Sequence, residues 1–286
     1  MVPEQLNGAI MKTRRLGLLA AAAVLLGAAT FACFFTTADS RKATMPAPDV
    51  AAVPISTEEL AQAAEVRLFF GHMSVGENIL SGISALYAAK GLTQPRVVQF
   101  SVEGPLPQVP ASGAVVHALI GQNGDPLGKL RNFDALLRSG LADQVDVAVL
   151  KFCYVDFTTS TDVDQLFREY RKTLDALVRD FPRVTFLHST APLMVRTSGW
   201  KGNLKAMLGR DDNVTRERYS ALVREAYGAD RLFDIAAIEG TAPDGTRHPW
   251  LYAGYTTDGG HLNEGGSAVV ATGLLRLVAA AGQSRG

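Results

Sequence analysis

The stretch Phe69-Phe70-Gly71-His72-Met73-Ser74-Val75-Gly76 decides the fold, because an apolar, strand-like run breaks at a glycine-flanked serine and then passes into a helical pattern. A strand that leads through a short turn into a helix is the repeating unit of α/β proteins. Ligands of open α/β sheets bind beyond the carboxyl ends of the strands, and serine nucleophiles often stand at such a turn. Ser74 is therefore the first candidate for a functional residue.

The same alternation continues along the chain. Segments such as Val147–Leu150 are apolar on both faces, as in a sheet that helices cover on both sides. The pattern predicts a three-layer α/β/α sandwich around a mostly parallel five-stranded sheet. We expect strands at residues 66–71, 96–102, 146–152, 183–190 and 231–235, and helices at 77–90, 127–139, 162–180, 215–227 and 264–281.

A second candidate lies near the C-terminus, in Thr257-Asp258-Gly259-Gly260-His261-Leu262-Asn263. A carboxylate and an imidazole three residues apart in a glycine-rich loop are poorly placed for packing. They suit a general base and the group that orients it. With Ser74 as the nucleophile, His261 as the base and Asp258 as the orienting group, the sequence predicts a catalytic triad.

Each of these residues also has a purely structural interpretation. Ser74 followed three residues later by Glu77 fits a capping box for the next helix. Asp258 and Asn263 fit a turn and a helix cap, and His261 fits a surface histidine. The two ends of the domain nevertheless supply complementary halves of one catalytic device, which favours the triad.

Charge, cysteine and histidine content exclude several function classes. The 28 acidic and 28 basic residues balance, and no basic stripe is present, so binding of nucleic acid is not expected. The two cysteines, Cys33 and Cys153, cannot build a disulfide framework. His117, His188 and His248 have no metal-ligand spacing with each other, so we expect neither a metal nor another cofactor.

Residues 1–38 are predicted to be an export signal or a membrane anchor. Basic residues 12, 14 and 15 precede the apolar run 16–35, with Met11 as the expected start. Three outcomes stay open: a lipoprotein with Cys33 as its attachment site, ordinary cleavage near Thr36-Thr37-Ala38, or an uncleaved anchor. Each places the remainder outside the cytoplasm, whether periplasmic, secreted or membrane-anchored, with no other membrane contact. Residues 39–60 are predicted to be a linker, and residues 61–286 one folded domain.

The stretch Asp258-Gly259-Gly260-His261-Leu262-Asn263 resembles the terminal Asp-x-x-His-Leu-Asn block of the SGNH (GDSL-like) hydrolases. The Gly-Asp-Ser-Leu block of that family stands here as Gly71-His72-Met73-Ser74-Val75, with one residue more between glycine and serine. The resemblance covers Val66 to the C-terminus. It implies a flavodoxin-like fold and a serine esterase that needs no cofactor.

The resemblance also implies donors for the oxyanion. The Ser74 amide is the first, and the loop Gly121-Gln122-Asn123-Gly124-Asp125 is the expected source of others, from Gly124 or Gly121 and from the Asn123 side chain. The third family donor is an asparagine in Gly-x-Asn-Asp, where this chain has Cys153-Tyr154-Val155-Asp156. Asn123 or the Tyr154 hydroxyl would replace it. His72 and Tyr154 are expected to lie in or near the cleft. Asp156 is expected to structure its loop rather than to catalyse, although it could line the cleft.

Together these features predict an exported serine esterase that hydrolyses a small-molecule, glycan or lipid ester. Two alternatives remain at this stage. One is a non-catalytic envelope protein that binds a glycan or a partner on the same fold, because the Gly-x-Asn-Asp asparagine is missing. The other is an acyltransferase that uses the same triad. The sequence leaves the oligomeric state open.

Overall fold

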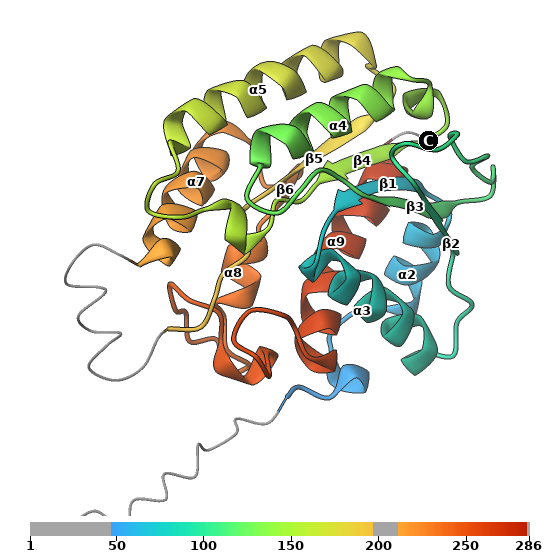
Figure 1. Ribbon diagram of the computed structural model, residues 1–286. Coiled ribbons are helices and arrows are strands. Elements are labelled where there is room, and N and C mark those ends of the chain that lie inside the picture. The colour runs from blue at the N-terminus through green and yellow to red at the C-terminus, as the bar shows by residue number, and fades with distance from the viewer. Residues whose placement is uncertain (1–46, 197–210, 285–286) are drawn as a thin grey trace, which may run out of the picture. The chain divides into compact units, whose positions relative to one another are not determined.

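The computed structural model describes residues 47–196 and 211–284 (Figure 1). These residues belong to one compact unit, Met45–Gly286. The predicted export segment, residues 1–38, lies outside the described residues. The described part of the predicted linker contains a 3-10 turn, η2 (Val50–Ala52), and the first turn of helix α2 (Thr57–Ala64), so the boundary predicted at residue 61 falls inside a helix.

The described residues form a single sheet of six parallel strands in the order β2-β3-β1-β4-β5-β6. The α/β class and the sandwich are as predicted, but the expected strand number of five is wrong. The strand that was not predicted, β3, follows a long loop without a helix, so the alternation of strands and helices passes over it. The strands are β1 (Arg67–His72), β2 (Arg96–Phe100), β3 (Ala114–Leu119), β4 (Val147–Leu150), β5 (Thr185–Ser189) and β6 (Leu232–Phe233).

Helices cover both faces of this sheet (Figure 1). Consecutive side chains of β1 point to opposite faces, so Phe70 packs beneath α3 and α9 while Phe69 packs beneath α4 and α5. One core therefore lies under α2, α3, α8 and α9, and the other under α4, α5 and α7. The helices not yet bounded are α3 (Val75–Ala89), α4 (Pro126–Arg138), α5 (Val163–Asp180), α7 (Asp212–Ala226), α8 (Ile235–Glu239) and α9 (Glu264–Gln283).

Side-chain caps set the starts of most helices. Ser56 and Glu59 form a reciprocal capping box at α2. Asp125 accepts a hydrogen bond from the Gly128 amide at the start of α4, where Pro126 occupies a first-turn position that suits proline. Asn263 caps α9 in the same way through the Gly266 amide. Helix α3 is the exception, because Ser74 at its N-cap makes no capping bond.

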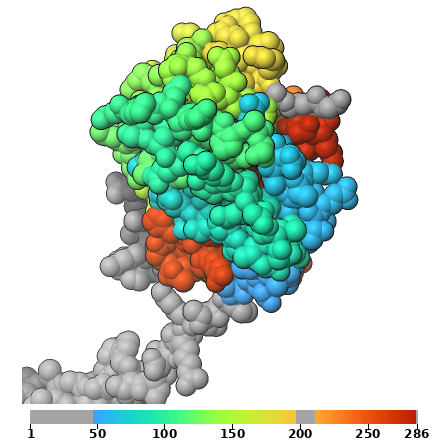
Figure 2. Space-filling model, turned by 90° about the vertical axis from the view of Figure 1, so that its right-hand side faces the viewer, coloured from blue at the N-terminus to red at the C-terminus, as the bar shows by residue number. Residues whose placement is uncertain are grey.

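Helix α9 is the central helix of its layer and packs against α2 and α3. Among the described helices it alone is long and apolar enough to cross a membrane, but 67% of its apolar window is buried inside the domain. Its apolar side chains are thus used for packing. Figure 2 shows the blue surface of α2 beside the red C-terminal end of the chain.

Candidate active site

Ser74 lies at the turn between β1 and α3, in a backbone conformation that serine rarely adopts. Its φ is 49° and its ψ is −103°, and no other described non-glycine residue has a positive φ. Such a conformation costs roughly 1–3 kcal/mol and occurs at the sharp strand-to-helix turns that expose nucleophiles. Because the Ser74 side chain does not cap α3, the capping-box interpretation is wrong.

The Ser74 hydroxyl instead contacts the C-terminal loop. Its Oγ lies 2.5 Å from Nε2 of His261, and Nδ1 of His261 lies 2.7 Å from Oδ2 of Asp258. The side chains of His261 and Asp258 are 43% and 54% exposed, so a molecule in solution can reach the imidazole. The three predicted residues thus form one hydrogen-bonded chain at the carboxyl edge of the sheet.

Asp258 is held as a carboxylate by several hydrogen bonds. Its Oδ1 accepts the backbone amides of Gly260 and His261 at 2.9 and 2.8 Å. The Gly260 amide and then the His261 side chain hold the pKa of Asp258 well below its usual range. A carboxylate that stays ionised can orient an imidazole throughout the neutral range.

Tyr154, predicted to lie near the cleft, packs against this loop. Its ring meets the His261 ring edge-on, with 5.8 Å between the ring centroids. Gly260 makes the close approach possible, since a Cβ at this position would lie 3.0 Å from Tyr154 Cζ. Arg216 donates from Nε to the Tyr154 carbonyl oxygen at 2.9 Å. Tyr154 therefore supports the histidine side of the site.

A buried lysine holds the peptide bond between Met73 and Ser74 from the interior of the protein. Lys151 is completely buried and donates from Nζ to the Met73 carbonyl oxygen at 2.8 Å. In a trans peptide the carbonyl and the following N–H point in opposite directions. Holding the Met73 oxygen towards the interior therefore turns the Ser74 amide away from Lys151, to the side where an oxyanion would need a donor.

In the loop expected to supply the other oxyanion donors, residues 121–125, some groups already make other hydrogen bonds. The Gly124 amide donates to Oδ1 of Asp156 at 2.8 Å, so the prediction of Gly124 as an oxyanion donor is wrong. Asn123 is exposed, and its Oδ1 accepts a bond from Lys129. Gly121 is therefore the remaining glycine candidate for a backbone oxyanion donor. The Ile120 amide donates to the His72 carbonyl oxygen at 3.1 Å, so the segments that lead from β3 to Gly121 and from β1 to Ser74 lie side by side.

Asp156 structures its loop, as expected, and does not line the cleft. It forms an ion pair of 2.6 Å with Lys129, and both side chains are completely buried. Asp156 also accepts the Cys153 amide at 2.7 Å. Since it binds the Gly124 amide as well, the carboxylate ties the loop after β3 to the loop after β4. Its role is structural: breaking such a buried pair on one side typically costs about 3–5 kcal/mol.

His72 is also buried and does not reach the cleft, contrary to the prediction. Its Nε2 lies 3.0 Å from Nδ1 of His117 on β3, and the two rings stack with centroids 5.1 Å apart. Glu77 lies beside them, so that ligand atoms of the three residues fall within 4.8 Å of one another. Among the described residues this cluster could hold a metal ion, and the spacing of the histidines in the sequence does not reveal it.

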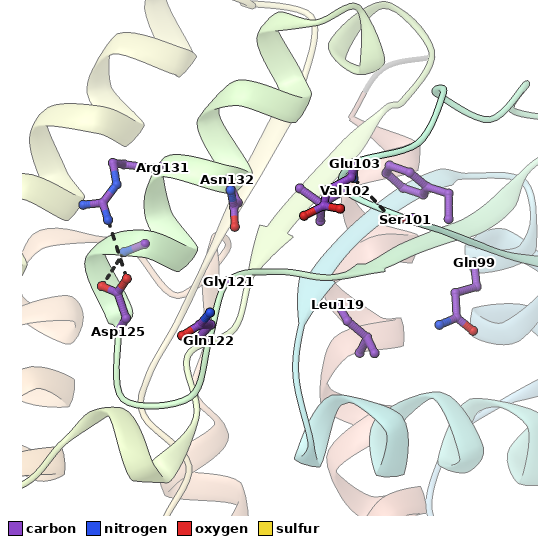
Figure 3. A pocket seen from close by; sticks show the side chains of 12 residues that line it. Gln99, Ser101, Val102, Glu103, Leu119, Gly121, Gln122, Asp125, Arg131 and Asn132 are labelled. Atoms are coloured by element: carbon purple, nitrogen blue, oxygen red, sulfur yellow. Dashed lines mark hydrogen bonds and ion pairs between the residues drawn. The ribbon is translucent and has the colours of Figure 1, made fainter.

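A cavity of about 910 Å³ opens at the carboxyl ends of β2 and β3, beside α4. Figure 3 shows Arg131 and Asn132 on one side and Gln99 and Leu119 on the other. Leu119 is the register partner of His72, and Gly121 also lines the cavity. None of the three triad residues lines this cavity. Its lining is mainly polar, with the side chains of Gln99, Ser101, Glu103, Gln122, Asp125, Arg131 and Asn132.

Sequence reasoning missed a set of buried charged residues behind the site, Lys129, Lys151, Arg216 and Glu239. The available signals were weak. Lys151 extends the apolar strand β4 by one residue, and Lys129 shares the apolar face of α4 with Phe133. Glu239 is wholly buried, and burial raises its pKa to about 8.

No protein-family model matches the chain, and neither does any curated protein. Among solved structures, a Streptococcus pneumonia protein described as a platelet activating factor is 16% identical, with a TM-score of 0.45 over 89% of this chain and 97% of its own. A catalytic mutant of Axe2, an acetylxylan esterase from Geobacillus stearothermophilus, is 12% identical, with a TM-score of 0.35 over 75% of this chain and 94% of its own. At these identities and TM-scores neither likeness bears on the activity of this chain.

Proposed function

We propose that this protein is an exported serine hydrolase that cleaves esters. The observation that carries the proposal is the continuous hydrogen-bonded chain from Ser74 through His261 to Asp258, with distances of 2.5 and 2.7 Å. A capping serine or a surface histidine would not need this arrangement. The positive φ of Ser74 is a second support, because strain persists where the surroundings enforce it.

In the proposed reaction, Ser74 Oγ attacks the ester carbonyl carbon while His261 Nε2 takes its proton. Asp258 holds the Nδ1 proton and stabilises the imidazolium that forms. When the tetrahedral intermediate collapses, the bond to the alcohol oxygen breaks and His261 gives the proton to the leaving alcohol. Water then attacks the acyl-serine, again with His261 as the base, and releases the acid.

The developing oxyanion would be bound by the Ser74 and Gly121 amides, with the Asn123 side chain as a candidate third donor. Each such donor is worth about 3–4 kcal/mol by the cost of deleting one in another hydrolase. Gly121 takes the place of Gly124, whose amide already serves Asp156. Both backbone donors then lie two residues after the ends of the neighbouring strands β1 and β3.

The polar cavity supports a polar alcohol, such as an O-acylated sugar, over a lipid. Its lining carries amide, hydroxyl, carboxylate and guanidinium groups that can bind sugar hydroxyls. Gly121, a proposed oxyanion donor, is part of that lining. The predicted export segment would place such an enzyme outside the cytoplasm, among acylated glycans of the cell envelope.

Labelling with a fluorophosphonate probe tests the proposal, because only an activated serine reacts quickly. We expect rapid labelling of the wild type and none of Ser74→Ala, with loss of p-nitrophenyl acetate hydrolysis. Ser81→Ala, an exposed serine on the same helix, is the matched control and should label normally. Wild-type protein that never labels would favour the binding-protein alternative. Labelling without hydrolysis in water, but with acyl transfer to an added alcohol, would favour the acyltransferase.

A further inference from the structure

A cluster of three potential metal ligands lies behind the nucleophile turn. His72 ends β1, His117 lies on β3, and Glu77 is in the first turn of α3. The ligand atoms of the three residues all lie within 4.8 Å of one another. We propose that His72, His117 and Glu77 bind one divalent transition-metal ion, a site separate from the triad.

Packing holds the His72 imidazole in place before any ion arrives. The His72 ring packs on Phe70 at 4.6 Å between centroids. Its Nδ1 faces Gly76, where a Cβ would lie only 2.2 Å away, so the opposite nitrogen, Nε2, is directed at His117. Ligands whose rotamers are locked by packing lose little entropy on binding a metal.

The hydrogen bond between the two imidazoles is compatible with metal binding. One of the two facing nitrogens carries a proton and the other accepts it, across 3.0 Å. An ion replaces that proton when the donor ring shifts it to its other nitrogen, so the pair keeps its protons and supplies two lone pairs.

The spacing indicates which ions fit. With metal–nitrogen distances of about 2.1 Å, the 3.0 Å separation of the two nitrogens corresponds to an angle of about 90° at the metal. That is the angle between neighbouring ligands of an octahedral ion. Two imidazoles and a carboxylate on one face, with the other positions open, are typical of first-row transition metals.

Glu77 completes the set from the solvent side. His72 and His117 are only 0% and 4% exposed, whereas Glu77 is exposed. The histidines thus form the buried side of the site, and Glu77 lies on the side from which an ion would enter. Its charge partly neutralises the ion, while water occupies the open positions.

The test is calorimetric titration of the purified chain, residues 1–286, with Co²⁺ after removal of metals by a chelator. We expect one equivalent to bind and Co²⁺ to raise the melting temperature, because it binds only the folded state. Glu77→Gln should weaken the Kd roughly tenfold or more, and His117→Gln should abolish binding. Glu264→Gln, which changes a first-turn glutamate of α9, is the matched control and should bind normally.

His261→Ala separates this site from the triad and should keep its Co²⁺ equivalent. Loss of binding in this variant, or unchanged binding in both Glu77→Gln and His117→Gln, would contradict the proposal. The absence of any Co²⁺ binding by the wild type would also contradict it. If His117→Gln fails to fold, Glu77→Gln decides the question, because its side chain lies at the surface.

Discussion

Asp258 uses its two carboxylate oxygens for two different tasks. Oδ1 accepts the amides of Gly260 and His261 and shapes the loop, while Oδ2 faces the imidazole. Since the pKa of Asp258 lies well below its usual range, the carboxylate remains ionised in mildly acidic solution. Loss of activity in that range should not come from protonation of Asp258.

Asp258→Asn should therefore preserve the loop and impair catalysis. The amide oxygen can keep the Oδ1 contacts, but an NH₂ group at Oδ2 would donate to Nδ1 of His261. The proton would then sit on Nε2, which could no longer accept one from Ser74. We expect kcat to fall by a factor on the order of 10³–10⁴, with an unchanged melting temperature.

The matched control for this variant is Asp244→Asn, another exposed aspartate that accepts a backbone amide two residues ahead. Steady-state hydrolysis of p-nitrophenyl acetate is the measurement. A fully active Asp258→Asn would reduce Asp258 to a turn residue and remove it from the triad.

Lys151 makes a second residue-scale prediction. Lys151→Met keeps the length of the side chain and removes the donor to the Met73 carbonyl oxygen, so the peptide that presents the Ser74 amide is less well held. We expect kcat to fall roughly tenfold to hundredfold with little change in KM. Stability should hold or rise, because replacing a buried charge by a packed apolar group is often favourable.

The control for Lys151→Met is Lys90→Met, which removes a partly exposed lysine at the end of α3. The rate of fluorophosphonate labelling should follow kcat, since both depend on the same amide. A merely structural role would instead lower the melting temperature and leave the rate per folded molecule unchanged.

At the scale of elements, α3 and α9 bring the two halves of the site together. Helix α3 begins directly after Ser74, and α9 begins three residues after His261, directly after its cap Asn263. The helices approach so closely that a Cβ at Gly82 would lie 2.2 Å from the Ser267 carbonyl oxygen. This close packing helps to set the distance between the serine and the histidine.

Gly82→Ala should therefore destabilise the protein, although alanine favours a helix by about 1 kcal/mol over glycine. Overpacking of this kind costs roughly 1–3 kcal/mol, and a clash with backbone leaves no flexible side chain to move. Urea unfolding should give a lower free energy of unfolding, with reduced kcat for the folded fraction. Ser81→Ala, on the exposed face of the same helix, is the control and should be neutral or slightly stabilising. A stable, fully active Gly82→Ala would show that α3 and α9 can separate freely.

At the scale of the whole molecule, Glu239 couples stability to pH. Its Oε2 accepts the Leu193 amide at 2.6 Å, while its buried Oε1 has no partner. Burial raises its pKa from 4.5 to about 8, so the folded protein keeps a proton that the unfolded chain loses. The stabilising contribution of this proton is complete below about pH 4.5 and is lost as the pH rises towards 8.

Glu239→Gln should remove this dependence, because glutamine can accept the same amide and does not ionise. Between pH 5 and pH 8 its free energy of unfolding should fall less than that of the wild type, at about 1.4 kcal/mol per unit of pKa difference removed. Urea unfolding at several pH values measures the effect, and the exposed Glu225→Gln is the control. Parallel curves for the wild type and Glu239→Gln would mean that Glu239 is ionised in the folded protein.

Local pattern by itself determined the α/β class, five of the six strands and the three residues proposed as a triad. Each of these features depends on a short segment of sequence. The segments are an apolar run, a glycine-flanked serine, and a carboxylate three residues before a histidine. Only the tertiary structure decided the contacts that join distant segments. The pairing of His72 with His117 follows from the register of β1 and β3, and β3 itself was missed because no helix precedes it. The Lys129–Asp156 ion pair likewise joins residues from two separate segments, and Asp156 also accepts the Gly124 amide. No local sequence pattern could reveal these contacts.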